Sequence, residues 1–310
     1  MNPLTVVMYH YVRNLRRSRY PEIRALESDA FERQLGFFIS NYAMVSMDDV
    51  VSALNGEGTL PEKAALLTFD DGYMDHYETV FPMLFDRKLQ GVFFPPTAAV
   101  IGNEVLDVNK IHFILSSCTD PSILVDEIDR TIETERDKYD LPSLARYKKQ
   151  FFQKSRYDPP EIIYIKRMLQ LGLPMELRRE IAARLFARFV TEDEAAFSRE
   201  LYMNVDQLRA MTEGGQHIGS HGDEHEWLSK MSREAQERNI RMSLEMQTMI
   251  HGRADPFTFC YPYGDYNEET LEILQELGCV AAFTTEPTVA TISSSKRLTL
   301  ARLDTNDFPQ

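Results

Sequence analysis

Short apolar runs alternate with longer segments of helical periodicity along most of this chain. An apolar run bounded by polar or turn-forming residues predicts a buried strand. Such runs lie at Leu4–Tyr9, Ala43–Ser46, Ala64–Phe69, Gly91–Phe94, His217–Ser220, Phe257–Cys260, Val280–Thr284 and Leu298–Leu303. Between them, apolar residues recur three or four positions apart, which predicts amphipathic helices. We expect these helices at Asp29–Asn41, Met47–Leu54, His76–Lys88, Arg233–His251 and Glu268–Leu277.

Several of the predicted helices carry residues suited to capping. Ser28 and Ser232 are expected as N-caps, because a serine hydroxyl can accept a hydrogen bond from the first turn. Gly278 is expected to end the helix before it, since glycine readily adopts the left-handed conformation. Strands and helices that alternate in this way favour right-handed crossovers, and therefore a parallel sheet or barrel of the α/β class.

The alternation stops in the middle of the chain. Residues 102–205 are highly charged, keep helical spacing throughout and contain no convincing strand. We therefore expect a barrel built from residues 1–101 and 206–310, interrupted by an all-helical insertion at 102–205. Loops that follow parallel strands lie at the carboxyl rim of a barrel, so the insertion is expected to act as a lid over that rim. A stabilising appendage on the side of the barrel is the alternative.

Two adjacent carboxylates follow one of the buried strands. Asp70 and Asp71 come directly after the apolar run and before the turn at Gly72. Neighbouring like charges at a buried strand end are costly unless a cation or strong donors compensate. A divalent metal ion is the simplest such cation.

A pair of histidines follows a second strand. His221 and His225 are four residues apart, so their imidazoles reach one point if the segment forms a turn of helix. Two histidines and one aspartate are typical of a catalytic divalent site, which leaves a coordination position open for water and substrate. This ligand set suits Zn²⁺, and Co²⁺, Ni²⁺ or Fe²⁺ fit it as well.

Composition narrows the class of protein. The chain has 310 residues, 43% of them hydrophobic, and a net charge of −14, which argues against general binding to nucleic acid or to an anionic membrane. No run of about 18 apolar residues is present, so no membrane-spanning helix is expected. The first residues do not resemble a secretory signal, and three cysteines without metal-type spacing favour reduced thiols. We therefore expect a cytoplasmic protein.

Several motifs in the same order resemble those of one known family. The chain is similar, over roughly residues 1–100 and 205–310, to the polysaccharide deacetylases, also called carbohydrate esterase family 4 or the NodB homology domain. The run Thr68–Gly72 matches the family motif TFDDG without a change, and His221–His225 matches H-[ST]-x-x-H except at Gly222. The segments that also resemble family members are Val6–His10, Tyr261–Gly264, Ala282–Thr285 and Arg302–Asp304.

This resemblance implies a fold, an activity and a set of site residues. The fold is a distorted (β/α) barrel of seven or eight strands, and the activity is metal-dependent removal of an N-acyl group from an amino sugar. Asp70 is implied as the catalytic base, and the backbone N–H of Tyr263 as a donor to the oxyanion. Asp71, His221 and His225 are implied as the metal ligands.

Two elements of the family pattern are missing. The motif arginine that positions the base falls at Cys260, and we expect Arg302 on the last strand to supply the charge instead. The late histidine that usually acts as the general acid is also absent, and His10 at the end of the first strand is its best substitute. The alternatives are an ordinary surface or ion-paired role for Arg302 and a strand-capping role for His10.

A cluster of arginines follows His10. Arginine suits bidentate binding of phosphate, which favours a phosphorylated, nucleotide-linked or lipid-linked amino sugar, a precursor of a surface glycan, as the substrate. A solvated loop, or pairing with acidic helices of the insertion, is the alternative. The cluster consists of Arg13, Arg16, Arg17 and Arg19.

Other functions stay open from the sequence. A related amide hydrolase, such as a deformylase or a ureide hydrolase, would use the same residues. A non-catalytic barrel that binds a glycan or a protein partner is favoured by Cys260 and by the missing late histidine, and opposed by the intact base and ligand set. The acyl group, the sugar, the native metal and the oligomeric state are not determined by the sequence.

Overall fold

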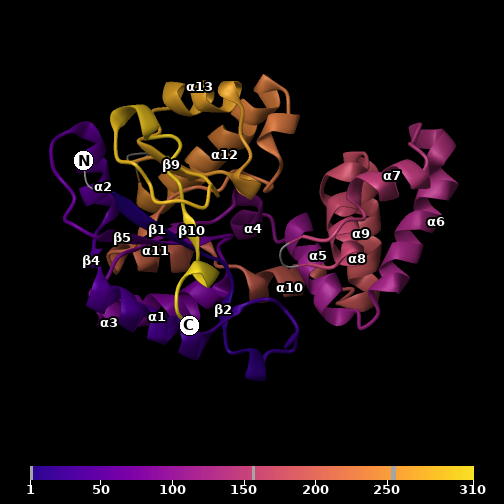
Figure 1. Ribbon diagram of the computed structural model, residues 1–310, viewed down its shortest axis with the longest axis horizontal. Coiled ribbons are helices and arrows are strands. Elements are labelled where there is room, and N and C mark those ends of the chain that lie inside the picture. Colours follow the sequence, from indigo (N-terminus) through magenta and orange to yellow (C-terminus); the bar gives the residue numbers. More distant parts are fainter. Residues whose placement is uncertain (1–2, 156–157, 253–255) are drawn as a thin grey trace. The chain divides into compact units, whose positions relative to one another are not determined.

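The computed structural model describes residues 3–155, 158–252 and 256–310 (Figure 1). The chain forms two compact units. The first consists of Met1–Asn14, Ala25–Glu104 and Ser198–Gln310, and the second of Leu15–Arg24 and Val105–Phe197. The described residues contain no helix with both the length and the apolar character needed to cross a bilayer.

Parallel strands form the centre of the first unit. β1 (Leu4–Tyr9) pairs along its whole length with β5 (Ala64–Asp70), so that Leu4 lies opposite Ala64 and Tyr9 opposite Phe69. β6 (Gly91–Phe94) and then β7 (His217–Ile218) extend the sheet beyond β5. The short strand β4 (Ala43–Met44) pairs with the start of β5.

The remaining strands close this sheet into a distorted barrel. A parallel bridge from Ser220 to Phe259 joins the β7 segment to β8 (Thr258–Cys260), which pairs with β9 (Ala281–Phe283). The end of the chain closes the barrel through two pairings. Leu300 pairs with β9, and β10 (Leu303–Asp304) pairs with β1. The prediction of a parallel α/β barrel is confirmed.

Both faces of the central strands are buried, which explains their unbroken apolar runs. Leu4 and Val6 of β1 belong to a core cluster with residues of β8 and β9, inside the barrel. Val7 and Tyr9 belong to a second cluster with residues of the outer helices. Asp70 lies an even number of residues from the interior Leu66 of β5, so the alternation of the strand directs its side chain into the barrel.

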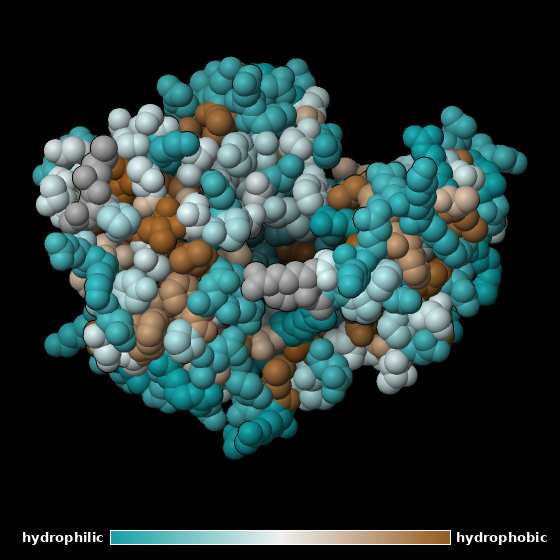
Figure 2. All heavy atoms as spheres, in the orientation of Figure 1, coloured by the Kyte–Doolittle hydropathy of each residue, from teal (hydrophilic) through white to brown (hydrophobic). Residues whose placement is uncertain are grey.

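Helices of the first unit lie outside the strands, with α12 and α13 on one side and α1, α3 and α11 on the other (Figure 1). Their bounds are Ser28–Asn41 (α1), Met47–Asn55 (α2), Phe81–Asp86 (α3), Thr97–Ile101 (α4), Val205–Glu213 (α11), Arg233–His251 (α12) and Glu268–Glu276 (α13). A two-stranded ribbon is formed by β2 (Val12–Arg13) and β3 (Leu26–Glu27). Hydrophilic side chains cover α13 in Figure 2, as expected for a helix with one solvent face.

Some predicted element ends differ from the observed ones. Ser232 caps α12 through the N–H of Ala235, and Gly278 follows α13 in the left-handed conformation, as predicted. The prediction for Ser28 is wrong, because the helix starts one residue earlier and Glu27 takes the cap position without a side-chain bond. The helix predicted over 76–88 begins as a π-helical turn at His76–Val80.

The second unit contains helices and turns, without a strand in its described part. The helices are α5 (Asp107–Ser117), α6 (Pro121–Tyr139), α7 (Leu144–Phe151), α8 (Pro160–Arg167) and α9 (Met175–Phe189), and α10 (Glu194–Leu201) leads back to the first unit. The sequence places the insertion at 102–205, whereas this unit spans 105–197 and also takes in 15–24. Tyr20 packs edge-on against Phe113 and Phe197, which anchors that early segment. The role of the insertion as a lid stays a prediction.

Candidate metal centre and active site

Three side chains converge at the carboxyl end of the barrel strands. Oδ1 of Asp71 lies 3.6 Å from Nε2 of His221 and 3.5 Å from Nε2 of His225. All three side chains are buried, and their ligand atoms lie within 4.8 Å of one another. The structure therefore brings together the aspartate and the two histidines that the sequence separates by about half of the chain.

The backbone around Asp71 turns sharply after β5. Asp71 and Gly72 both have positive φ, of 73° and 69°, and the N–H of Asp71 donates to the carbonyl of Phe94 on β6 at 3.1 Å. A Cβ at position 72 would lie 2.7 Å from the Cβ of Pro95, so only glycine fits there without movement. This turn separates the directions of Asp70 and Asp71 and gives each carboxylate its own surroundings.

The histidine loop is not helical, and the expectation that His221 and His225 share a helix face is wrong. Gly222 and His225 both have positive φ, of 72° and 55°, which a right-handed helix does not allow. A Cβ at Gly222 would lie 2.7 Å from Oδ1 of Asn239, which accepts a hydrogen bond from the N–H of Asp223. A serine or threonine at position 222 would therefore collide with Asn239 unless one of the two moved.

The hydrogen bonds and protonation states of these three side chains are suited to binding a cation. Oδ1 of Asp71 is buried and has no hydrogen-bond donor among the described residues. Nδ1 of His221 donates to the carbonyl of Cys260 at 2.7 Å, which leaves a lone pair on Nε2, the atom that faces Asp71. Burial lowers the pKa of His221, and it lowers the pKa of His225 to about 3, so both imidazoles are neutral at pH 7. Neutral imidazoles and an unpartnered carboxylate oxygen fit a divalent metal ion.

Arg302 forms a bidentate ion pair with Asp70. Nη1 of Arg302 lies 2.8 Å from Oδ1 of Asp70 and Nη2 lies 2.7 Å from Oδ2. Burial alone would raise the pKa of Asp70, but the guanidinium outweighs burial and holds this pKa well below its usual range. Asp70 is therefore ionised. Arg302 is only 1% exposed, so it is not a surface residue.

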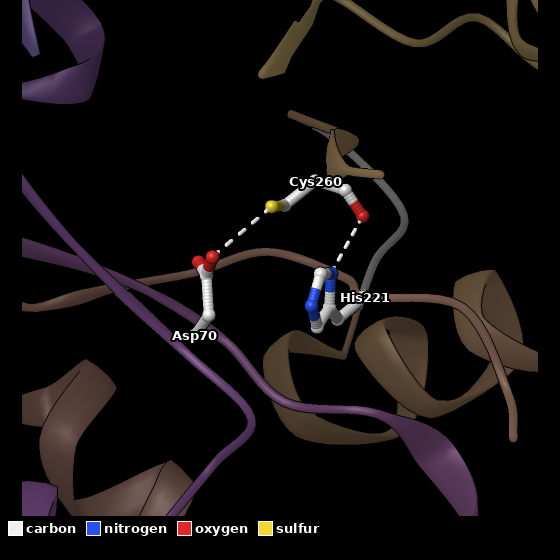
Figure 3. A group of neighbouring side chains, drawn as sticks. All are labelled: Asp70, His221 and Cys260. Atoms are coloured by element: carbon white, nitrogen blue, oxygen red, sulfur yellow. Dashed lines mark hydrogen bonds between the residues drawn. The ribbon is translucent and has the colours of Figure 1, made fainter. Parts of the chain in front are cut away.

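Cys260 contacts both Asp70 and His221 (Figure 3). Its Sγ points to the carboxylate of Asp70 at 3.5 Å, while its carbonyl accepts the bond from His221. Asp70, His221 and Cys260 also lie close enough to form a metal site. Nη2 of Arg302 is 3.0 Å from Sγ, however, and burial raises the pKa of the thiol well above its usual value. A protonated thiol beside a guanidinium is a poor ligand, so the geometry favours the site around Asp71.

His10 lies at the edge of the same site. Its Nε2 is 3.9 Å from Oδ2 of Asp70, and its side chain is 42% exposed. The backbone carbonyl of His10 accepts a hydrogen bond from Nε2 of the buried His76. Burial lowers the pKa of His76 to about 4, so this histidine is a neutral donor that holds the end of β1. The role of His10 as general acid stays a prediction.

Tyr263 lies beside the histidine loop. Its ring stacks on Trp227 with 4.4 Å between centroids and meets the ring of His225 edge-on at 4.5 Å. Its φ of 58° places the residue in a tight turn, where Gly264 follows with φ of 70°. The backbone N–H of Tyr263 as an oxyanion donor stays a prediction.

The predicted arginine cluster is divided between the two units. Nε of Arg13 donates to Oδ2 of Asp75 at 2.7 Å in the first unit. Arg16, Arg17 and Arg19 belong to the second unit, where the first two lie in a 3₁₀ turn and Arg19 packs over the ring of Tyr20. Arg13 is thus already paired with a carboxylate.

Sequence reasoning missed one residue of the site. The hydroxyl of Tyr73 donates to Oδ2 of Asp71 at 2.5 Å from a fully buried position. Tyr73 directly follows the TFDDG motif, and this position is the feature of the sequence that could have indicated its place in the site.

Comparison with known proteins identifies the family. The model of the family described as Polysaccharide deacetylase matches residues 57–154 and 187–282, more than half of the chain. The chain therefore belongs to the polysaccharide deacetylase family, as the motifs predicted.

Individual relatives agree with this assignment. A segment of 72 residues is 38% identical to poly-beta-1,6-N-acetyl-D-glucosamine N-deacetylase of Escherichia coli K12, and it covers 23% of this chain and only 11% of the length of that enzyme. The deacetylase PplD of Streptococcus pyogenes, solved with acetate, has a TM-score of 0.60 and 16% identity, with 97% of this chain and 92% of that chain covered. IcaB from Ammonifex degensii has a TM-score of 0.56 and 18% identity, with 98% and 91% covered. At these identities the two structures establish a shared fold.

Proposed function

We propose that this protein is a metal-dependent N-deacetylase that removes an acetyl group from an N-acetylated amino sugar of a glycan. The observation that carries the proposal is the buried Oδ1 of Asp71, which lies 3.6 Å from Nε2 of His221 and 3.5 Å from Nε2 of His225. Family membership and the E. coli relative, whose name specifies N-deacetylation of a glucosamine polymer, support the reaction and the substrate class.

Asp71, His221 and His225 are the residues that would hold the metal. A divalent ion bound there supplies a polarising charge for the acyl oxygen and a water with a lowered pKa. The donor set suits Zn²⁺, and Co²⁺, Ni²⁺ or Fe²⁺ as well.

The other side chains would handle the protons. Asp70 is ionised and held by Arg302 in one orientation, so it can accept the proton of the attacking water as the general base. His10, whose partly exposed imidazole has its Nε2 3.9 Å from Oδ2 of Asp70, would donate a proton to the leaving amine nitrogen. The N–H of Tyr263, whose ring contacts that of His225, would bind the developing oxyanion.

The finer identity of the substrate is a separate part of the proposal. A phosphorylated, nucleotide-linked or lipid-linked amino sugar is suggested by the arginines after His10. The ion pair between Arg13 and Asp75 lowers the support for phosphate binding at that arginine. A polymeric N-acetylglucosamine substrate is therefore tested beside the phosphorylated ones.

Metal content and acyl release test the function together. We expect purified protein to contain a divalent metal and to release acetate from N-acetylglucosamine oligomers or from nucleotide-linked N-acetylated sugars. A chelator should abolish release and added Zn²⁺ or Co²⁺ should restore it. Asp71→Asn should weaken metal binding by more than the 10–100-fold that loss of an outer hydrogen-bond partner costs.

The alternatives give different results in the same assay. Formate or another acid in place of acetate would identify a related amide hydrolase. Protein that holds metal at no detectable affinity and releases no acid would favour a non-catalytic barrel that binds a glycan or a partner. Equal rates with phosphate-bearing and phosphate-free sugars would remove the case for phosphate recognition.

A further inference from the structure

The two oxygens of the Asp71 carboxylate have different surroundings. Oδ1 faces the two imidazoles and has no hydrogen-bond donor among the described residues. Oδ2 accepts the hydroxyl proton of Tyr73 at 2.5 Å. A carboxylate oxygen that already accepts a short hydrogen bond offers less charge to a cation than its free partner. The negative charge that the Asp71 carboxylate offers to a cation therefore lies mainly on Oδ1.

Packing holds the ring of Tyr73 in one place. Tyr73 is fully buried, and its ring stacks on that of Tyr11 with 3.9 Å between centroids. Tyr202 lies parallel to the same ring at 6.2 Å, and His76 meets it edge-on at 5.5 Å. The backbone is tied as well, since Tyr73 and Tyr202 form an antiparallel bridge and the N–H of Met203 donates to the carbonyl of Gly72. The hydroxyl cannot leave Asp71 without disturbing this cluster.

We propose that Tyr73 is a positioning residue for the metal centre: its hydroxyl occupies Oδ2 of Asp71, so that the carboxylate binds a divalent ion through Oδ1 alone. One-oxygen coordination keeps a coordination position free that a two-oxygen carboxylate would fill, and this position is needed for water and substrate. The inference rests on the proposed metal site and adds a residue that holds its geometry.

Zinc affinity of variants tests the proposal without using activity. The dissociation constant for Zn²⁺ is measured at pH 7.5 by competition with a chromogenic chelator. We expect Tyr73→Phe to bind Zn²⁺ about tenfold more weakly or worse, because loss of an outer hydrogen-bond partner costs 10–100-fold. Tyr202→Phe, which removes a hydroxyl from the same aromatic cluster, should bind like the wild type. A constant for Tyr73→Phe within threefold of the wild type, or tighter, overturns the proposal.

A structure of the zinc-loaded wild type provides a second test that needs no variant. Asp71 is expected to bind through Oδ1 alone while Oδ2 keeps the bond from Tyr73. Coordination through both oxygens overturns the proposal, even if Tyr73→Phe fails to fold. Asp71→Asn distinguishes failure of the proposed metal site from failure of the role proposed for Tyr73. If wild type and Asp71→Asn both fail to bind Zn²⁺, the proposed function falls with the inference. If Asp71→Asn alone loses binding and Tyr73→Phe keeps it, only the role of Tyr73 is wrong.

Discussion

At the scale of single residues, Arg302 shows how a buried charge is accommodated in this protein. Its guanidinium contacts both oxygens of Asp70, and its Nε donates to the carbonyl of Thr284 at 2.9 Å. Nη1 also donates to the hydroxyl of Thr68. A buried ion pair contributes to stability only when such additional bonds satisfy its remaining donors. The arrangement fixes the carboxylate of the proposed base, and that constraint is the function we assign to Arg302.

Removal of Arg302 should therefore affect both stability and turnover. Arg302→Met leaves Asp70 as an unpaired buried charge, which costs about 3–5 kcal/mol of unfolding free energy. We expect turnover to fall far more than metal affinity, because the metal ligands keep their contacts. Urea unfolding, steady-state kinetics and zinc titration measure the three quantities.

A double variant separates the two effects of that substitution. Arg302→Met combined with Asp70→Asn removes the uncompensated charge, so it should regain stability over the single variant and remain inactive. Wild-type turnover in Arg302→Met would show that the ion pair is structural only.

At the level of secondary structure, the loop between β7 and α12 is an irregular part of the site that depends on left-handed backbone conformations. Two left-handed residues, Gly222 and His225, direct both imidazoles to Asp71. Asn239 on α12 holds the loop by accepting the N–H of Asp223. The loop is therefore shaped by a helix that follows it in the sequence, and a side chain at position 222 would meet that helix.

Gly222→Ala tests this dependence. The added Cβ forces both a left-handed alanine, at a cost of about 1–2 kcal/mol, and a contact with Asn239. We expect lower stability and a metal affinity reduced at least about tenfold, measured by thermal unfolding and zinc competition. Gly278→Ala is the matched control, since Gly278 has φ of 75° with open space around its Cα. Equal zinc affinity in the two variants would show that the loop tolerates displacement.

At the scale of the whole molecule, buried histidines join separate parts of the barrel and make its stability depend on pH. Nε2 of His217 on β7 bonds to the hydroxyl of Thr258 on β8 at 2.8 Å, and His76 bonds to the end of β1. Burial lowers the pKa of His217 to about 3 and that of His76 to about 4. The unfolded chain binds these protons near pH 6.5, so it gains protons before the folded protein does.

The metal-free protein should therefore be most stable above about pH 6.5 and lose stability as the pH falls toward 4. Each buried histidine contributes up to roughly 1.4 kcal/mol per pH unit across this window. Urea unfolding at pH 7 and pH 5 measures the loss, and His217→Gln should show a shallower dependence on pH than the wild type. Identical slopes for the two proteins would contradict the assignment of His217 as a buried neutral group.

The sequence by itself determined the features that depend on neighbouring residues. The strands β1 and β6 and the helix α12 were predicted with their observed bounds, because hydrophobic periodicity is local. The motifs around Asp70 and His221 are also runs of neighbouring residues, and they indicated the candidate ligands Asp71, His221 and His225, which lie together in the structure. Residues 15–24 were not assigned to the helical unit, because this association depends on contacts between distant residues, such as Tyr20 with Phe113 and Arg24 with Asp158.

Tertiary structure decided the contacts between distant segments. Closure of the barrel places Arg302 against Asp70, and packing around Tyr73 selects the oxygen of Asp71 that faces the histidines. The spacing of His221 and His225 is compatible with a turn of helix, but the loop is not helical. The hydrogen bond to Asn239 and the left-handed turn at Gly222 hold it in another conformation. Side-chain geometry of this kind depends on how distant strands are arranged in space, and a local sequence pattern does not predict that arrangement.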